Sequence, residues 1–343
     1  MAEASAGAAL AAPVTGVRAR DRRLPMTNRS TRPGLARAAG ALALAGAGAL
    51  AWAALVEVRW YALRQVTVPL LPPGQEPLRV LHVSDLHLTP GQRRKVDWVR
   101  DLATWRPHLV VNTGDNWAHL EAMTTVLDAL EPLLAVPGAF VLGSNDFVGP
   151  KPKNPARYLL PDARTHHPAP TPLPWRELVG RFTAAGWLDL DNHRGVLDLD
   201  GRRVSFVGTA DAHLDADRMP APGGPDDARR DGDVDLHIGV THAPYRRVLD
   251  AFLADGVDLA IAGHTHGGQL GVPGWGALTT NSDLDTRRAK GLHGWPGPRP
   301  DHPGGADSMW LHVSAGLGTS PYAPIRFAVR PEATLLTLTP PAS

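Results

Sequence analysis

The sequence predicts an α/β domain that follows one N-terminal transmembrane helix. From residue 78 onward, short apolar runs alternate with longer amphipathic stretches, and polar or glycine-containing turns separate them. This alternation is typical of strands and helices that follow one another along an α/β chain. Before this region, the nineteen residues Ala38–Val56 carry no charge. At the rise of an α-helix, such a stretch is long enough to cross roughly 30 Å of hydrocarbon.

The elements of the predicted domain, residues 72–343, follow one another in a regular order. We expect strands at residues 78–83, 109–112, 139–142, 204–207, 236–240, 259–262, 311–314 and 334–338. We expect helices at residues 94–105, 120–134 and 245–254. Three segments rich in proline, glycine and charge are predicted to be surface loops, at residues 149–174, 215–233 and 293–307.

The N-terminal region is predicted to be a disordered basic tail over residues 1–37, followed by a membrane anchor over residues 38–58. The tail contains seven arginines against Glu3 and Asp21, and it has no apolar periodicity. Positive charge before the anchor places the N-terminus in the cytoplasm and the domain on the outer side of the membrane. The alternatives are a cleaved signal, an export signal built on the Arg22–Arg23 pair, and an alanine-rich helix of a soluble protein.

The composition excludes several kinds of site. The chain has no cysteine, so disulfides, thiolate zinc sites and thiol nucleophiles are excluded, and any metal must be bound through nitrogen and oxygen. Thirty-five basic residues nearly balance thirty-four acidic ones, which gives a formal charge of +1. This balance gives no indication of a nucleic-acid partner.

Side chains that can bind a metal follow five of the predicted strands. These residues are Asp85 and His87, Asp115, Asn145 and Asp146, His242, and His264 and His266. In an open α/β sheet the ligand lies beyond the carboxyl ends of the strands, so residues from distant parts of the chain should converge in one crevice. Even without Asp146, six strong ligands and an asparagine exceed what one ion takes, and they suit two divalent cations about 3.5 to 4 Å apart.

Five short motifs carry these residues in a fixed order. They are Asp85-x-His87, Gly114-Asp115, the Gly-Ser-Asn-Asp turn at 143–146, Thr-His242-Ala-Pro and Gly-His264-Thr-His266-Gly-Gly-Gln. Together they resemble the calcineurin-like metallophosphoesterase family, and within it the predicted bacterial phosphohydrolases of the membrane-anchored type. The resemblance implies a four-layer αββα sandwich of two mixed sheets. It also implies that Asp115 bridges two ions, one held by Asp85, His87 and His266 and the other by His242, His264 and Asn145.

The third motif departs from the family, which has Gly-Asn-His and an acid where this chain has Gly143, Ser144, Asn145 and Asp146. If the two motifs are aligned without a shift, Ser144 replaces the family's ligand asparagine and Asn145 replaces its catalytic histidine. With a shift of one residue, Asn145 stays a ligand and Asp146 takes the place of the histidine. We prefer the shifted alignment, because an amide oxygen is a better ligand for a hard cation than a serine hydroxyl. It predicts catalytic roles for Asn145 and Asp146.

Neither an asparagine nor an ionised aspartate fully replaces a histidine that protonates a leaving group. Either His213 or Asp211 supplies that function, or the natural leaving group departs without a proton. His213 is also a candidate contact to the substrate, and the alternative for it is an ordinary surface position. Arg287 follows an acidic stretch and is a second candidate contact, to a phosphate oxygen.

These features predict a dinuclear metal-dependent phosphoesterase that hydrolyses phosphate mono- or diesters by attack of a metal-activated hydroxide. Manganese, iron, zinc and magnesium all suit nitrogen and oxygen ligands, so the spacing does not choose among them. Membrane attachment favours an envelope or lipid-linked phosphoester as the substrate. The alternatives are a membrane-anchored, non-catalytic metal-binding or scaffold protein and a cytosolic nucleotidase.

Overall fold

The computed structural model describes residues 33–150, 152, 171–223, 227 and 234–341. Most of the predicted basic tail and most of the loop predicted at 149–174 lie outside these residues, as does part of the loop predicted at 215–233. The chain divides into two compact units, Met1–Gly46 and Ala47–Ser343.

The N-terminal helix begins earlier than the predicted anchor. α1 covers Pro33–Ala51, and a π-helical turn, Trp52–Val56, and a 3-10 turn, Glu57–Arg59, follow it directly. The last residues of the predicted tail are therefore helical. Within the described residues, one helical stretch, Arg37–Arg59, is long and apolar enough to cross a membrane, with a mean hydropathy of 1.9.

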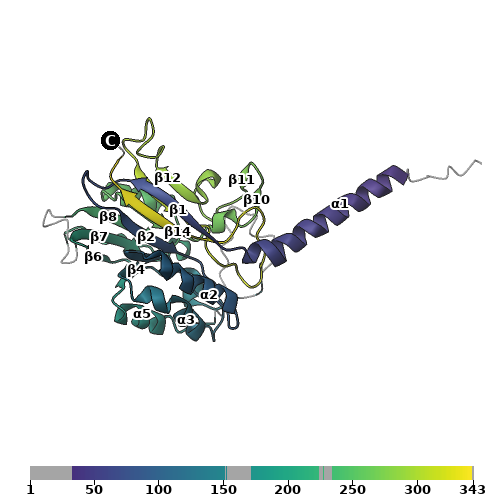
Figure 1. Cartoon of the computed structure of the whole chain (residues 1–343), viewed down its shortest axis with the longest axis horizontal. Helices are drawn as coiled ribbons and strands as arrows, with labels where there is room; N and C mark the ends of the chain where they lie inside the picture. Colours follow the sequence, from purple (N-terminus) through teal and green to yellow (C-terminus); the bar gives the residue numbers. More distant parts are fainter. Residues whose placement is uncertain (1–32, 151, 153–170, 224–226, 228–233, 342–343) are drawn as a thin grey trace, which may run out of the picture. The chain divides into compact units, whose positions relative to one another are not determined.

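The first sheet has six strands in the order β1-β14-β2-β3-β4-β5. Figure 1 labels β1, β14, β2 and β4 of this sheet. Neighbours from β2 to β5 are parallel, whereas β14 pairs antiparallel with β2 and parallel with β1. The bounds are Ala62–Pro69 for β1, Leu78–Val83 for β2, Leu109–Asn112 for β3, Gly138–Phe140 for β4, Leu188–Asp189 for β5 and Glu332–Thr339 for β14.

The second sheet also has six strands, in the order β12-β13-β9-β8-β7-β6. Neighbours from β13 to β7 are parallel, and the two outer strands, β12 and β6, are antiparallel to the strands beside them. The bounds are Arg194–Leu199 for β6, Arg202–Thr209 for β7, Leu236–Thr241 for β8, Leu259–Ala262 for β9, Gly291–Trp295 for β12 and Met309–Val313 for β13. A short hairpin is formed by β10, Gly271–Val272, and β11, Gly276–Ala277.

The interior strands are apolar on both faces, because one face meets helices and the other meets the opposite sheet. In β2, Leu81 and Val83 pack against the helices, whereas Val80 packs in the core between the sheets. Ile238 of β8 and Ile261 of β9 contribute to the same inter-sheet core from the second sheet.

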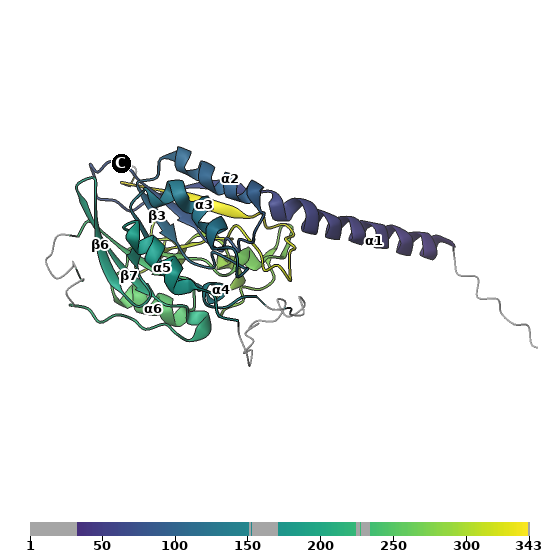
Figure 2. The ribbon, with the colours of Figure 1, turned by 90° about the horizontal axis from the view of Figure 1, so that it is seen from below.

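Helices cover the outer face of each sheet (Figures 1 and 2). α2 (Arg93–Asp101), α3 (Met123–Leu134) and α5 (Trp175–Ala184) pack against the first sheet, and α6 (Arg246–Ala254) packs against the second. A short helix, α4 (Ser144–Phe147), follows β4. The predicted four-layer αββα sandwich of two mixed sheets is therefore confirmed.

Two boundaries differ from the prediction. β1 pairs with β14 from Ala62–Glu332 to Pro69–Thr339, so the domain includes a strand that ends before residue 72. Only Ala62 and Val68 of β1 are buried, which leaves little apolar signal in its sequence. β12 takes up the first residues of the loop predicted at 293–307, because the chain there pairs with β13 at the edge of the second sheet.

Candidate metal centre

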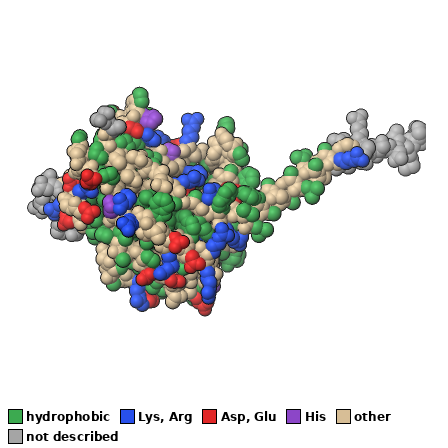
Figure 3. All heavy atoms as spheres, in the orientation of Figure 1, with side chains coloured by type: hydrophobic (Ala, Val, Ile, Leu, Met, Phe, Trp, Pro, Cys, Tyr) green, Lys and Arg blue, Asp and Glu red, His purple; other side chains and the backbone are tan. Residues whose placement is uncertain are grey.

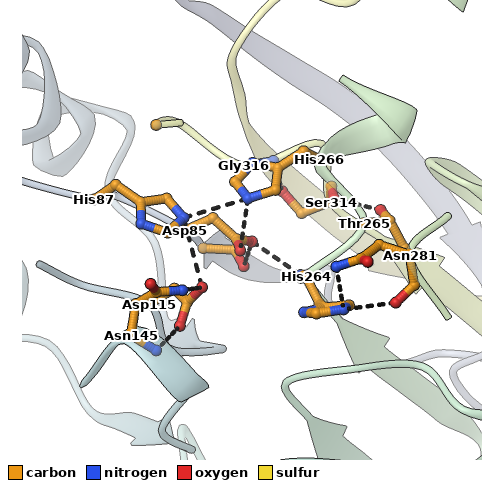
Figure 4. A network of polar contacts seen from close by, with 12 residues as sticks. Asp85, His87, Asp115, Asn145, His264, Thr265, His266, Asn281, Ser314 and Gly316 are labelled. Carbon is orange, nitrogen blue, oxygen red and sulfur yellow. Dashed lines mark hydrogen bonds and ion pairs between the residues drawn. The ribbon is translucent and has the colours of Figure 1, made fainter. Parts of the chain in front are cut away.

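Seven predicted ligands converge at the carboxyl ends of strands from both sheets. Figure 4 labels six of them, all except His242. Asp85 and His87 follow β2, Asp115 follows β3 and Asn145 lies in α4, shortly after β4. His242 follows β8, and His264 and His266 follow β9. Five of the seven expose no more than 5% of their surface, and they are Asp85, His87, Asp115, His242 and His264.

The first group of ligands consists of Asp85, His87 and His266, whose ligand atoms all lie within 4.8 Å of one another. The Nε2 atoms of His87 and His266 are 3.3 Å apart. Asp85 Oδ1 lies 3.6 Å from His266 Nε2. Two strand ends of different sheets thus direct one carboxylate and two imidazoles toward a common point.

The second group consists of Asp85, Asp115 and His242, whose ligand atoms also all lie within 4.8 Å of one another, so Asp85 belongs to both groups. Asp115 Oδ2 lies 3.6 Å from His242 Nε2 and 3.5 Å from His87 Nε2, so it faces a histidine of each group. His264 Nδ1 is 3.3 Å from His242 Nε2. The side-chain amide of Asn145 lies 2.7 Å from Asp115 Oδ2.

These distances lie within a few tenths of an ångström of those between ligands of a divalent cation. Ligands about 2.1 Å from a common ion are about 3.0 to 3.4 Å apart at octahedral or tetrahedral angles. Within the described residues, Asp85 Oδ1 is buried and makes no hydrogen bond. A buried carboxylate oxygen without a donor is unfavourable unless a cation satisfies it. The donor set of carboxylate oxygens and imidazole nitrogens is one that divalent metals bind.

Two histidines are fixed in the tautomer that a metal requires. His242 Nδ1 lies 2.6 Å from the carbonyl oxygen of Thr113, and His264 Nε2 lies 3.1 Å from that of Asn281. A carbonyl oxygen can only accept, so the proton is on the nitrogen that faces it. The other nitrogen of each ring, His242 Nε2 and His264 Nδ1, is the one directed into the cluster.

The pKa values reflect a strongly anionic site. Burial raises the pKa of Asp85 to about 6, against the opposing effect of His242. Burial also acts to raise the pKa of Asp115, but His242 and His87 outweigh it and hold this pKa at about 2. Burial acts to lower the pKa of His242, but Asp115, Asp211 and Asp85 raise it to about 10. Without a cation, one protonated histidine therefore offsets part of the carboxylate charge.

Metal binding should release protons in a manner set by these pKa values. Between pH 6 and pH 10, the cation displaces the proton of His242, so we expect the apparent association constant to rise about tenfold per pH unit. Below pH 6, Asp85 also holds a proton that must be displaced. The apparent association constant should therefore fall more steeply with decreasing pH in that range. Titration calorimetry of the metal-free protein from about pH 5 to pH 9 measures this slope. A flat dependence between about pH 7 and pH 9 would contradict the raised pKa of His242.

The backbone at the ligands is left-handed rather than extended. Five ligands have positive φ angles, namely 51° at Asp85, 41° at His87, 56° at Asp115, 67° at His264 and 50° at His266. Residues other than glycine rarely adopt this conformation, which costs of order 1 kcal/mol or more at each position. Asp85 and His87 therefore point the same way because the chain turns sharply after β2, and not because of the strand-like alternation that their spacing suggests.

Gly143 allows the two sheets to approach at the site. A Cβ atom at this position would overlap Asp115 Oδ1 and the ring of His242. Gly143→Ala is therefore expected to displace both ligands and to remove most of the bound metal, as elemental analysis of the purified protein would measure. Gly180→Ala is the matched control, because a Cβ there meets nothing within 4 Å on α5. It should keep the metal and stabilise the fold by about 0.5 to 1 kcal/mol. A full metal complement in Gly143→Ala would refute this assignment.

A buried chain of hydrogen bonds supports the ligands from behind. His82 Nε2 lies 2.9 Å from Thr113 Oγ1, Thr113 Oγ1 donates to Ser84 Oγ, and Ser84 Oγ donates to Asp85 Oδ2. His82 Nδ1 lies 3.0 Å from Nδ1 of His312 on β13, so the chain joins the two sheets. Burial lowers the pKa of both histidines well below its usual value. The sequence did not indicate this network, since each member looks like an ordinary polar residue within or next to a strand.

Asp146 does not occupy the position expected of a substitute for the catalytic histidine. It is fully buried, and its carboxylate accepts hydrogen bonds from the backbone N–H groups of Asp115, Asn116 and Gly143. Burial and the nearby Asp115 raise the pKa of Asp146 to about 7. This position holds the turns that carry the ligands and gives Asp146 no direct access to a substrate.

His213 and Arg287, the two weaker predictions, lie in different places. His213 is half-buried at the edge of the cluster, with its ring centroid 4.5 Å from that of His264. Its Nδ1 lies 3.1 Å from the hydroxyl of Tyr245, and its backbone N–H donates to Asp211 Oδ1. Arg287 instead lines a cavity whose described lining includes Gly267 but none of the seven ligands.

The chain matches the family model described as calcineurin-like phosphoesterase over residues 78–268. YpbG, an uncharacterized protein of Bacillus subtilis strain 168, is 24% identical over 273 residues, which cover 78% of this chain and 83% of that protein. TT1561 of Thermus thermophilus is a similar solved structure, with 13% identity, 71% of this chain and 91% of that chain covered, and a TM-score of 0.36.

A second similar structure is the purple acid phosphatase PPD1 from seeds of yellow lupin, Lupinus luteus. It shares 12% identity, with 57% of this chain and 39% of that chain covered and a TM-score of 0.33, so this chain spans less than half of its length. The family model alone matches more than half of this chain, and the matched segment contains all seven candidate ligands. The chain therefore belongs to the calcineurin-like phosphoesterase family.

Proposed function

We propose that this protein hydrolyses phosphate mono- or diesters with two divalent cations. Asp85, His87 and His266 would hold one cation, and His242, His264 and Asn145 would hold the other, with Asp115 between them. The observation that supports two cations best is the position of Asp115 Oδ2, 3.5 Å from His87 Nε2 and 3.6 Å from His242 Nε2. A single carboxylate that faces ligands of both groups suits a bridge.

When bound, the cations would lower the pKa of an attacking water molecule and offset the charge on the phosphoryl oxygens. The chain itself positions the groups that hold them. Asp115 Oδ1 accepts a hydrogen bond from the backbone N–H of Asn145, which fixes the orientation of the carboxylate. Asn145 can present its amide oxygen to the second cation after a rotation that exchanges its oxygen and nitrogen. Thr113 and Asn281 hold the rings of His242 and His264.

We assign protonation of the leaving group to His213. No histidine is present in the third motif, and Asp146 is engaged with backbone N–H groups. His213 lies beside the ligand His264 and is partly accessible, so its imidazole can approach a substrate held at the centre. The hydroxyl of Tyr245 orients the ring through Nδ1. An imidazole can donate a proton to a departing alkoxide, which suits a general acid.

The stretch Arg37–Arg59 would anchor the enzyme in a membrane. Its length and mean hydropathy of 1.9 suit a single span, and 6% of the most apolar window is buried within the protein. Six arginines precede it, which favours a cytoplasmic N-terminus and an extracytoplasmic metallophosphoesterase domain. A metal-dependent hydrolase at this location could act on envelope phosphoesters.

The proposed function is tested by hydrolysis of p-nitrophenyl phosphate and bis(p-nitrophenyl) phosphate. The full chain would be stripped of metal in detergent and then supplied with manganese, iron, zinc or magnesium. We expect turnover only with added cation. The ester that is hydrolysed faster shows whether the protein acts mainly on phosphate monoesters or on phosphate diesters. Bound cations without turnover on either ester would favour the non-catalytic alternative.

A further inference from the structure

A cavity of about 640 Å³ connects the metal centre with the end of the N-terminal helix. The metal ligand His87 lines it on one side. Val58 and Arg59, from the 3-10 turn that ends the candidate span, also line it. A molecule that fills this cavity would therefore touch both a metal ligand and the boundary of the span.

The charged side chains of the lining are all basic. Arg59, Arg93, Arg94 and Lys95 line the cavity, and no described aspartate or glutamate does so. Arg93 and Arg94 are exposed at the start of α2. Burial, with Arg326 and Arg59 nearby, lowers the pKa of Lys95 to about 7. The protein thus places four basic side chains around one cavity without an acidic one in its described lining, an arrangement that a bound anion would stabilise.

The apolar part of the lining comes partly from the helix end. Ala54 and Val58 line the cavity, together with Pro324 of the segment that precedes β14. Trp52, on the π-helical turn, and Trp60, directly after the 3-10 turn, are 42% and 48% exposed. Exposed tryptophans are typical of the boundary between hydrocarbon and water. Figure 3 shows hydrophobic and basic side chains side by side over the region of α2 and the chain that follows α1.

Arg326 fixes the helix end to the metal centre. Its backbone N–H donates to the carbonyl oxygen of Ala53, and its side-chain Nη2 lies 3.2 Å from His266 Nδ1. The same nitrogen donates to the carbonyl oxygen of Gly318, which lines the cavity. The guanidinium is fully buried, and burial lowers its pKa to about 10, so it remains charged at neutral pH. The cavity is therefore held in a fixed place relative to the metal ligands.

We propose that the substrate is the phosphoester head group of a membrane amphiphile, which enters this cavity from the membrane surface. The proposal rests on the hydrolase function proposed above. The basic side chains would bind the phosphate next to His87, and the apolar part of the molecule would lie against Ala54 and Val58. A soluble phosphate compound would use the cations but leave the apolar side without a partner. The end of the span places the cavity at the depth where lipid head groups lie.

Matched pairs of compounds that differ only in acyl chains test this proposal on the full chain in maltoside micelles. The monoester pair is dihexanoyl phosphatidate and glycerol 3-phosphate, and the diester pair is dihexanoyl phosphatidylglycerol and glycerophosphoglycerol. We expect kcat/KM to be at least about tenfold higher for the acylated member of the pair that is hydrolysed, because burial of two methylene groups already gives such a factor.

Two variants locate the effect in the cavity. Val58→Gln should lower the ratio of kcat/KM for the acylated ester to kcat/KM for the unacylated ester about tenfold, because the acyl chains lose apolar contact. Arg93→Gln with Arg94→Gln should raise KM for the acylated ester about tenfold or more, through loss of charge-assisted hydrogen bonds. Arg100→Gln, on the same helix but outside the cavity lining, should leave kcat/KM unchanged. The unfolding midpoint of each variant confirms that it folds.

The outcomes separate this proposal from the proposed hydrolase. If the unacylated member is hydrolysed as fast as the acylated one, or if Val58→Gln keeps the wild-type ratio, the cavity does not bind a lipid while the hydrolase assignment stands. If the wild-type protein hydrolyses no member of either pair and no p-nitrophenyl ester, both proposals fail.

Discussion

Asp115→Asn is expected to lower kcat/KM for any phosphoester by about a thousandfold or more. The carboxylate of Asp115 faces His87 and His242 and is the residue we propose as the bridge. An amide of the same size keeps the shape of the site but removes the negative charge between two cations. Elemental analysis and steady-state kinetics with added metal measure the two effects, and we expect the bound metal to fall together with turnover.

Thermal unfolding with and without a chelator gives an independent readout of the same change. A cation that binds only the folded protein stabilises it by an amount that depends on its affinity and concentration. Chelation should therefore lower the unfolding midpoint of the wild type and change that of Asp115→Asn much less. Asp97→Asn, an exposed position on α2, is the matched control and should behave as the wild type. Full turnover by Asp115→Asn would rule out a bridging role.

The interior of both sheets could be predicted from the sequence, but the edges could not. All eight predicted strands correspond to β2, β3, β4, β7, β8, β9, β13 and β14, which are the interior strands. Such strands are apolar on both faces, and Leu109–Asn112 of β3 is fully buried. In the two six-stranded sheets, the missed strands are the four edges, β1, β5, β6 and β12, and the two-stranded hairpin of β10 and β11 was missed as well. Their partly exposed faces leave too few apolar residues for the pattern to stand out.

The residues of the candidate site could be predicted because the fold brings the strand ends together. Each of the seven follows an interior strand, and metal-binding side chains in that position are conspicuous in a sequence. The supporting residues were not conspicuous. Asp146 looked like a substitute for a histidine, yet its burial and its three backbone donors are properties of the folded turn. The contact of Arg326 with His266 joins residues sixty positions apart, and no short motif encodes it.

The burial of Lys95 also could not be predicted from the sequence pattern. Lys95 lies in an amphipathic helix, where a lysine is expected to face water, but its side chain is 6% exposed and donates to the carbonyl oxygen of Leu86. Lys95 is buried because α2 begins directly beside the turn that carries Asp85 and His87. Its position depends on the packing of two elements, and helical periodicity alone does not specify that packing.

His213→Ala is expected to act selectively on esters with poor leaving groups. An alkoxide must be protonated as it departs, so loss of the general acid should lower kcat about a hundredfold for an alkyl phosphate. The p-nitrophenolate ion is stable without a proton, so the same variant should lose less than about threefold on p-nitrophenyl phosphate. The ratio of the two losses is the measurement. A structural role, in which His213 merely packs against His264, would lower both rates to a similar extent.

The pH dependence distinguishes these roles further. A general acid must be protonated, so the alkyl phosphate rate of the wild type should fall at alkaline pH, and His213→Ala should lose this limb of the profile. His193→Ala removes an exposed histidine elsewhere on the domain and should retain the limb. If the limb persists in His213→Ala, the proton must come from another group. Asp211, whose pKa burial raises to about 6, would then be the next residue to substitute.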